Sequence, residues 1–125
     1  MLRNLFIRLY CLTTLALIAE IATAQTKHVV QVGDNFFNPQ NVTANVGDTI
    51  RWTFVPGSME NHTTTSGSIP AGATAWDQLV NTANPAFEYV IMQPGTYNYV
   101  CTPHIALGMV GSFTASPATS VTTAP

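Results

Sequence analysis

The run TIRWTFV at residues 49–55 limits the fold of this chain more than any other stretch of sequence. Its apolar residues Ile50, Trp52 and Phe54 alternate with polar ones. Successive side chains of a β-strand point to opposite faces, so this period predicts a strand with one face buried in a core. A helix would instead bury residues spaced three or four apart, and the run does not provide that spacing.

Similar short runs continue along the chain and are separated by residues that favour turns, such as the pair Pro94-Gly95. Tyr97, Tyr99 and Cys101 share one parity, which predicts that Cys101 points inward with the two aromatic side chains. No long helical period is present, so we expect an all-β fold, either a β-sandwich or a small barrel. The other predicted strands span 28–32, 41–46, 87–92, 96–101 and 109–115.

Two stretches lack this periodicity. Residues 56–86 are rich in proline and glycine and are predicted to form loops with at most short strands. The end of the chain, 116–125, is small, polar and proline-bearing, and is predicted to be a disordered tail or a short tether. Between the signal sequence and this tail, residues 25–115 are expected to form one domain around a single core.

The first 24 residues have the pattern of a secretory signal peptide. Arg3 and Arg8 make a positively charged start, 9–19 is a short apolar run, and small residues precede a predicted cleavage after Ala24. The apolar run is shorter than a membrane-spanning helix, and no later segment approaches the required length. We therefore expect an exported, soluble protein without a membrane span, located in the periplasm or secreted.

Charge excludes one class of partner. The predicted mature chain keeps two basic and five acidic residues, a net charge of −3 with neutral histidines. It has no basic patch that could neutralise phosphates, so nucleic acid is not an expected partner. Aromatic and branched aliphatic residues are plentiful, which argues against disorder of the whole chain. We expect a monomer.

Cleavage of the signal peptide would remove Cys11 and leave Cys101 as the single cysteine. An exported chain with one thiol cannot form an internal disulfide. The thiol is then a buried group without a chemical role, a reactive thiol, part of an intermolecular disulfide or a metal ligand.

The stretch CTPHIALGM bears on that choice because it combines three metal-binding side chains. His104 follows Cys101 by three residues, and Met109 follows His104 by five. Soft sulfur together with imidazole selects copper or zinc over hard cations, and methionine is a poor zinc ligand. With His62 added, the set becomes two histidines, one cysteine and a weak axial methionine, which is the set of a blue-copper electron-transfer site.

Simpler interpretations apply to the remaining candidates. His28 opens the first predicted strand and is interpreted as a partly exposed strand residue. Met59 and Met92 follow no pattern and fit core or loop filler. Asp34 and Asp48 fit turns best. A Cys-x-x-His pair by itself is weak evidence for a metal, because such pairs also arise by chance.

Several stretches together resemble the plastocyanin and pseudoazurin branch of the cupredoxins. CTPHIALGM matches the ligand loop of the family, Cys-x2-His-x4-Met, including the proline before histidine and the glycine before methionine. The similarity extends over 29–113. Further similar stretches are FFNPQNVTANVGDTIRW (36–52), FVPGSMENH (54–62) and PGTYNYVC (94–101).

The resemblance implies a cupredoxin-like Greek-key β-sandwich that holds one type 1 copper ion. It implies His62, Cys101 and His104 as equatorial ligands and Met109 as the axial one. Family members often carry asparagine directly after the first ligand histidine, whereas Thr63 stands here. A threonine hydroxyl can make the same bridge between the ligand loops.

The function implied is that of a soluble one-electron carrier that cycles between Cu(I) and Cu(II). Redox proteins, for example a cytochrome or a copper reductase, are expected to dock near Pro103, Ile105 and Leu107. The chain is not expected to be an enzyme, because His28 is the only spare histidine for a further copper centre. The alternatives are a periplasmic copper-binding carrier without an electron-shuttle role and a metal-free adhesive or structural sandwich.

Overall fold

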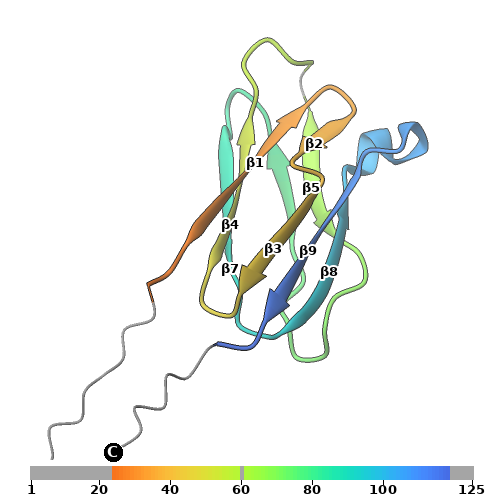
Figure 1. Ribbon diagram of the computed structural model, residues 1–125. Helices are drawn as coiled ribbons and strands as arrows, with labels where there is room; N and C mark the ends of the chain where they lie inside the picture. Colours follow the sequence, from red (N-terminus) through yellow and green to blue (C-terminus); the bar gives the residue numbers. More distant parts are fainter. Residues whose placement is uncertain (1–23, 60, 119–125) are drawn as a thin grey trace, which may run out of the picture.

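Two β-sheets face each other in the computed structural model, which describes residues 24–59 and 61–118 (Figure 1). One sheet has four strands in the order β2-β1-β4-β7, and the other has five in the order β3-β9-β8-β5-β6. The elements are β1 (Lys27–Gly33), β2 (Phe36–Asn38), β3 (Asn41–Asn45), β4 (Thr49–Phe54), β5 (His62–Ser66), β6 (Asp77–Val80), β7 (Ala86–Val90), β8 (Gly95–Val100), the 3-10 helix η1 (Thr102–Leu107) and β9 (Val110–Ser116).

The strands predicted from alternation are all present, with ends shifted by at most two residues. In β4 the burial follows the sequence pattern, because Ile50, Trp52 and Phe54 are buried while the residues between them are half-buried. In β8, Tyr97 and Tyr99 are buried, and the Cys101 side chain just beyond the strand is buried as well. The predicted all-β fold is confirmed. Of the two forms considered, a β-sandwich and a small barrel, the protein adopts the β-sandwich.

The pairing of the strands is mixed. β1 lies parallel to β4 and β3 lies parallel to β9, whereas the other neighbours are antiparallel. The tight link between β3 and β4 therefore carries the chain from one sheet to the other rather than closing a hairpin. Gly47 in this link has φ 98°, a left-handed conformation that favours glycine, and its N–H donates to Ile91 O at 2.8 Å.

Aromatic side chains fill the space between the sheets. The Trp52 ring lies 5.1 Å from the Tyr99 ring and 5.5 Å from the Trp76 ring, measured between centroids. Tyr97 stacks on Phe113 at 4.4 Å. Interiors of this kind are close-packed, so they resist displacement of any one side chain. The end of β8, from which Cys101 follows, is thereby held on a rigid support.

Residues 56–86 contain the short strands β5 and β6 joined by loops, in agreement with the prediction of loops with at most short strands. His62 was expected in an irregular loop, but it is the first residue of β5, which pairs with both β6 and β8. The run HTTTS lacks apolar alternation, so no pattern marked it as a strand. Neighbouring strands supply the order instead, and Trp76 Nε1 donates to Thr64 Oγ1 at 3.1 Å inside the core.

η1 lies at one end of the sandwich, while β1 begins and β9 finishes at the opposite end (Figure 1). The predicted cleavage concerns residues 1–24, nearly all outside the described residues. The predicted tail begins at Ser116, which still belongs to β9 and whose carbonyl accepts from Val46 N at 2.9 Å. Most of that tail also lies outside the described residues. Among the described residues, we find no helix with the length and hydropathy of a membrane span.

Candidate metal centre

Cys101 is positioned by β8 and by the segment that follows η1. Its N–H donates to Met109 O at 3.0 Å, so the two ends of the loop CTPHIALGM are joined by their backbones. The thiol is fully buried. It extends the inward-facing row of Tyr97 and Tyr99, as the parity of the sequence predicts.

His104 is positioned by η1. Cys101 precedes this helix with extended backbone, Pro103 occupies its first turn, and His104 N donates to Cys101 O at 3.1 Å. Gly108 ends the helix with φ 78°, where glycine avoids the strain that a side chain would create. His104 is partly exposed, whereas His62 is fully buried.

His62 is positioned by β5, a strand distant in sequence from the loop that carries Cys101 and His104. It starts β5, where it pairs with Val80, and its side chain is fully buried. The preceding residue, Asn61, has φ 73°, a left-handed conformation that asparagine adopts more readily than most residues. This turn directs the chain from the β4–β5 loop into the strand.

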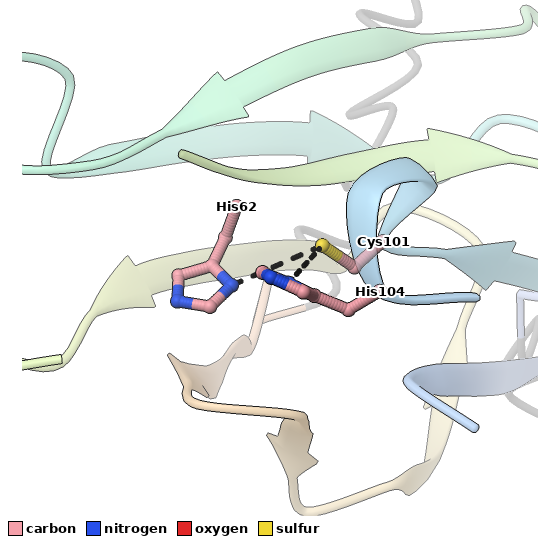
Figure 2. A group of neighbouring side chains, drawn as sticks. All are labelled: His62, Cys101 and His104. Carbon is pink, nitrogen blue, oxygen red and sulfur yellow. Dashed lines mark hydrogen bonds between the residues drawn. The ribbon is translucent and has the colours of Figure 1, made fainter. Parts of the chain in front are cut away.

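The two imidazole rings converge on the thiol (Figure 2). Cys101 Sγ lies 3.3 Å from His104 Nδ1 and 3.9 Å from His62 Nδ1. The ligand atoms of these three residues all lie within 4.8 Å of one another. The sequence places His62 and Cys101 39 residues apart, and the pairing of β5 with β8 in one sheet brings their segments together.

Met109, the fourth predicted residue, follows η1 in the chain and is fully buried. Its N–H donates to His104 O at 3.3 Å, and its carbonyl accepts from Cys101 N. The backbone of Met109 is thus hydrogen-bonded to the backbones of both Cys101 and His104. His28, interpreted as a strand residue, is partly exposed in β1 and lies 3.0 Å from Asp48 Oδ2, outside the group.

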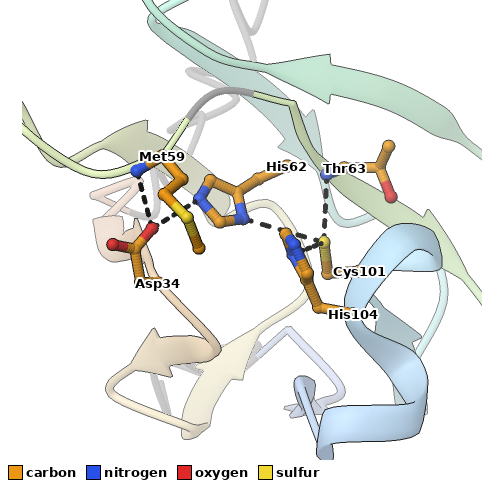
Figure 3. A network of polar contacts seen from close by, with 6 residues as sticks. All are labelled: Asp34, Met59, His62, Thr63, Cys101 and His104. Atoms are coloured by element: carbon orange, nitrogen blue, oxygen red, sulfur yellow. Dashed lines mark hydrogen bonds and ion pairs between the residues drawn. The ribbon is translucent and has the colours of Figure 1, made fainter.

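Thr63 connects the two segments that carry these side chains (Figure 3). Its N–H donates to Cys101 Sγ at 3.4 Å, and its hydroxyl oxygen accepts from Thr102 N at 2.8 Å. From the sequence, the hydroxyl of Thr63 was expected to bridge the ligand loops in place of the asparagine that family members often carry. The geometry confirms that the hydroxyl bridges the two segments.

The environment of His62 favours the neutral ring. Burial, and then the charge of the neighbouring His104, lowers the pKa of His62 below its ordinary value. The carboxylate of Asp34 acts in the opposite direction without outweighing them. A neutral imidazole has a free lone pair, which is the form that binds a metal.

The comparisons with known proteins agree with this geometry. Residues 24–116 match the family described as copper binding proteins, plastocyanin/azurin family. The chain belongs to this family. A plastocyanin from Prochlorothrix hollandica is 35% identical over 109 residues, which cover 81% of each chain. The structure of plastocyanin from the fern Dryopteris crassirhizoma is similar with a TM-score of 0.59 and 30% identity, covering 70% of this chain and 99% of that one. A pseudoazurin from Sinorhizobium is similar with a TM-score of 0.60 and 27% identity, covering 75% and 77%.

Copper is the cofactor that this family implies, and the residues present fit it. Two imidazole nitrogens and one thiol meet at a buried point, and such soft and borderline donors suit copper. Hard cations prefer oxygen ligands, and none of the three donors is an oxygen.

The loop that carries His104 also forms part of the surface. The residues around His104 on η1 are exposed, and among them Ile105 is 53% and Leu107 64% accessible to solvent. These are two of the positions that the sequence assigned to docking, and Pro103, the third, is exposed as well.

Sequence reasoning missed one residue that lies against the metal centre. Asp34 was assigned to a turn, yet its Oδ1 lies 3.4 Å from His62 Nε2. No local pattern marks this contact, because Asp34 lies in the turn between β1 and β2 of one sheet, whereas His62 starts β5 of the other.

Proposed function

We propose that this protein carries single electrons between redox proteins, with His62, Cys101, His104 and Met109 holding one type 1 copper ion. The observation that carries the proposal is the convergence of two imidazole Nδ1 atoms on one buried thiol. Two histidines, one cysteine and a nearby methionine are the donor set of blue-copper electron-transfer sites. When bound, copper supplies the one-electron chemistry by changing between Cu(I) and Cu(II).

The residues around the donors limit their movement. Cys101 follows a strand packed against the aromatic core, and its backbone is hydrogen-bonded to Met109. Thr63 joins the His62 strand to the His104 helix. A site held in this way changes shape little when the charge of its ion changes, which lowers the barrier to electron transfer. The N–H of Thr63 near the Cys101 sulfur is one means by which the protein tunes the potential.

Electron exchange is proposed to occur at the η1 end. His104 is partly exposed there, and its neighbours Pro103, Ile105 and Leu107 are exposed and apolar. A small apolar surface suits the brief and weak encounters of redox partners. We expect the partners to be redox proteins that dock on this surface.

The proposal places the protein in the periplasm or outside the cell as a soluble monomer. Its support is the N-terminal pattern of charge, apolar run and small residues that predicts cleavage after Ala24. We expect no enzyme activity of its own, because the mature sequence offers only His28 as a spare imidazole for further chemistry.

The test is to load the chain from Gln25 onward with Cu(II). We expect an intense blue colour and the narrow EPR splitting of a copper–thiolate bond. Replacing Cys101 by serine should remove both, whereas replacing the spare histidine, His28→Gln, should leave both. Protein that stays colourless, or colour that survives in Cys101→Ser, contradicts the proposal.

Voltammetry separates the electron carrier from a copper carrier. An electron carrier gives a reversible one-electron wave. Binding of copper without such a wave would instead assign the protein to copper handling, the alternative that the sequence left open.

A further inference from the structure

The second ring nitrogen of His62 lies on the side away from Cys101. Nδ1 is the ring nitrogen nearest the thiol, so Nε2 lies on the opposite side of the ring and faces Asp34 in the β1–β2 turn (Figure 3). Nε2 is fully buried and makes no hydrogen bond of good geometry with the described residues, and the backbone of Met59 and the Asp34 carboxylate are the two groups in reach of the ring on this side. Asp34 Oδ1 lies 3.4 Å from Nε2, close enough for an ion pair but outside the geometry of a hydrogen bond.

A metal ligand with such a buried nitrogen needs an acceptor. When Nδ1 gives its lone pair to a metal, the proton of the neutral ring is on Nε2. A buried N–H without an acceptor is costly, and metal-bound histidines almost always donate this proton to a carboxylate, a carbonyl or water. Asp34 presents a carboxylate oxygen at that position.

Asp34 is held there by the segment that leads to His62. Its Oδ1 accepts from Met59 N at 2.7 Å, which joins the β1–β2 turn to the β4–β5 loop. Asn35, the next residue, has φ 63°, and Asn61, just before His62, has φ 73°. The chain thus turns sharply beside each of the two contacting residues, and these turns place the carboxylate opposite the ring.

We propose that Asp34 is a positioning residue for His62: its carboxylate accepts the Nε2 proton, fixes the tautomer with Nδ1 free for the metal, and favours Cu(II) over Cu(I) through its negative charge. This inference rests on the proposed copper site. A negative charge attracts a doubly charged ion more strongly than a singly charged one. The Asp34 side chain is 41% exposed, so solvent screens part of this attraction, but the carboxylate lies next to a fully buried ring. Asp34 therefore lowers the reduction potential of the site.

Two substitutions separate the charge of Asp34 from its hydrogen bond. Asp34→Asn keeps an acceptor oxygen for Met59 N and His62 Nε2 but loses the charge. Asp34→Ala loses both. Loss of a partner of a metal-bound histidine commonly costs 10–100-fold in affinity. We expect Asp34→Asn to lower the affinity for Cu(II) relative to Cu(I) about tenfold, which for one electron equals a rise in potential of about 59 mV.

Asp77→Asn is the matched control. Asp77 also carries one negative charge, but it accepts from Thr65 Oγ1 at 2.8 Å and is not in contact with a histidine. We expect its voltammetric shift to be less than half that of Asp34→Asn. Equal shifts in reduction potential in the two variants would show that any surface charge has this effect, and would overturn the inference. An unchanged potential in Asp34→Asn would also overturn it.

A second measurement needs no copper. In ¹⁵N NMR spectra of the copper-free protein, we expect the wild type to hold its His62 proton on Nε2 and Asp34→Ala to show a mixture of tautomers. An unchanged tautomer in Asp34→Ala would overturn the positioning role. Wild-type protein that fails to turn blue with copper contradicts the proposed function itself, whereas blue wild type with unaltered Asp34 variants contradicts only this inference.

Discussion

The hydroxyl of Thr63 accepts a hydrogen bond from the backbone N–H of Thr102 at 2.8 Å. This bond joins β5, which starts with His62, to η1, which carries His104, and the hydroxyl groups of Thr65 and Thr102 add a second contact between these elements at 3.1 Å. The N–H of Thr63 also donates to Cys101 Sγ. One residue therefore ties together three of the side chains that form the proposed copper site, and it does so whether or not a metal is present.

Replacing Thr63 by valine keeps the shape of the side chain and removes this acceptor. We expect the free energy of unfolding of the copper-free protein to fall by about 1 kcal/mol, the usual net contribution of one such hydrogen bond. Urea denaturation followed by fluorescence measures it. Thr63→Asn places an acceptor at the same position and should recover much of the loss.

Thr114→Val is the control for that experiment, because Thr114 Oγ1 contacts Thr96 Oγ1 on an exposed face far along β9. A loss in Thr114→Val as large as in Thr63→Val would show that the bridge to Thr102 is not the cause.

Leu107→Glu tests the proposed docking surface without any knowledge of the partner. Electron self-exchange between Cu(I) and Cu(II) copies requires two such surfaces to meet, and like charges brought together there cost several kcal/mol. We expect self-exchange, measured by NMR line broadening, to slow at least tenfold at low salt. Added salt should restore part of the rate by screening.

Met92→Glu is the matched substitution for that test. Met92 is 68% exposed and lies between β7 and β8, at the start of the strand that ends near the thiol. It should leave self-exchange within about twofold of wild type, since it stands away from the η1 surface. An unchanged rate in Leu107→Glu would place electron exchange elsewhere on the molecule.

Asp48 should make stability depend on pH. Burial alone raises the pKa of this carboxyl, but the hydrogen bonds from His28 and from the N–H groups of Thr26 and Asn45 outweigh it and lower the pKa below 3.8. A lowered folded pKa stabilises the native state above the unfolded value and loses that effect as the pH falls through the folded value.

We therefore expect the difference in unfolding free energy between wild type and Asp48→Asn to be largest above about pH 5 and to shrink as the pH falls below 3.8. Urea titrations of the copper-free proteins from pH 7 to pH 3 measure this difference. A difference that stays constant over the range would contradict the role of the ionised carboxylate.

Gly111 faces the ring of Tyr99 across the β8–β9 pair. A Cβ at this position would lie 2.5 Å from Tyr99 Cζ, and the ring is packed between Phe37 and Trp52. Gly111→Ala should lower the unfolding free energy by about 1–3 kcal/mol, the usual cost of overpacking. Gly67→Ala, whose Cβ would meet Asn98 O at 3.4 Å and Asn98 C at 3.9 Å, should be close to neutral in the same denaturation assay. Equal stability of Gly111→Ala and wild type would contradict the close contact.

Local patterns predicted much of the sandwich because alternation of apolar residues depends only on neighbours in the chain. Ile50, Trp52 and Phe54 are buried on one face of β4, as their spacing predicts. The same reasoning failed for β5, since HTTTS has no apolar alternation and is ordered by pairing with β6 and β8. The alternation pattern also did not predict that β1 lies parallel to β4.

The sequence by itself determined the donor types and the placement of three of them on one loop, because Cys101, His104 and Met109 lie within nine residues. It also determined that the thiol points inward, through the parity of β8. The tertiary structure decided the rest: it brought His62 to 3.9 Å from the thiol, put Thr63 between the ligand segments, and set Asp34 beside the far nitrogen of His62. These contacts join residues 25 or more positions apart. The pairing of β5 with β8 within one sheet fixes the contacts of His62 and Thr63, and the packing of the two sheets fixes that of Asp34.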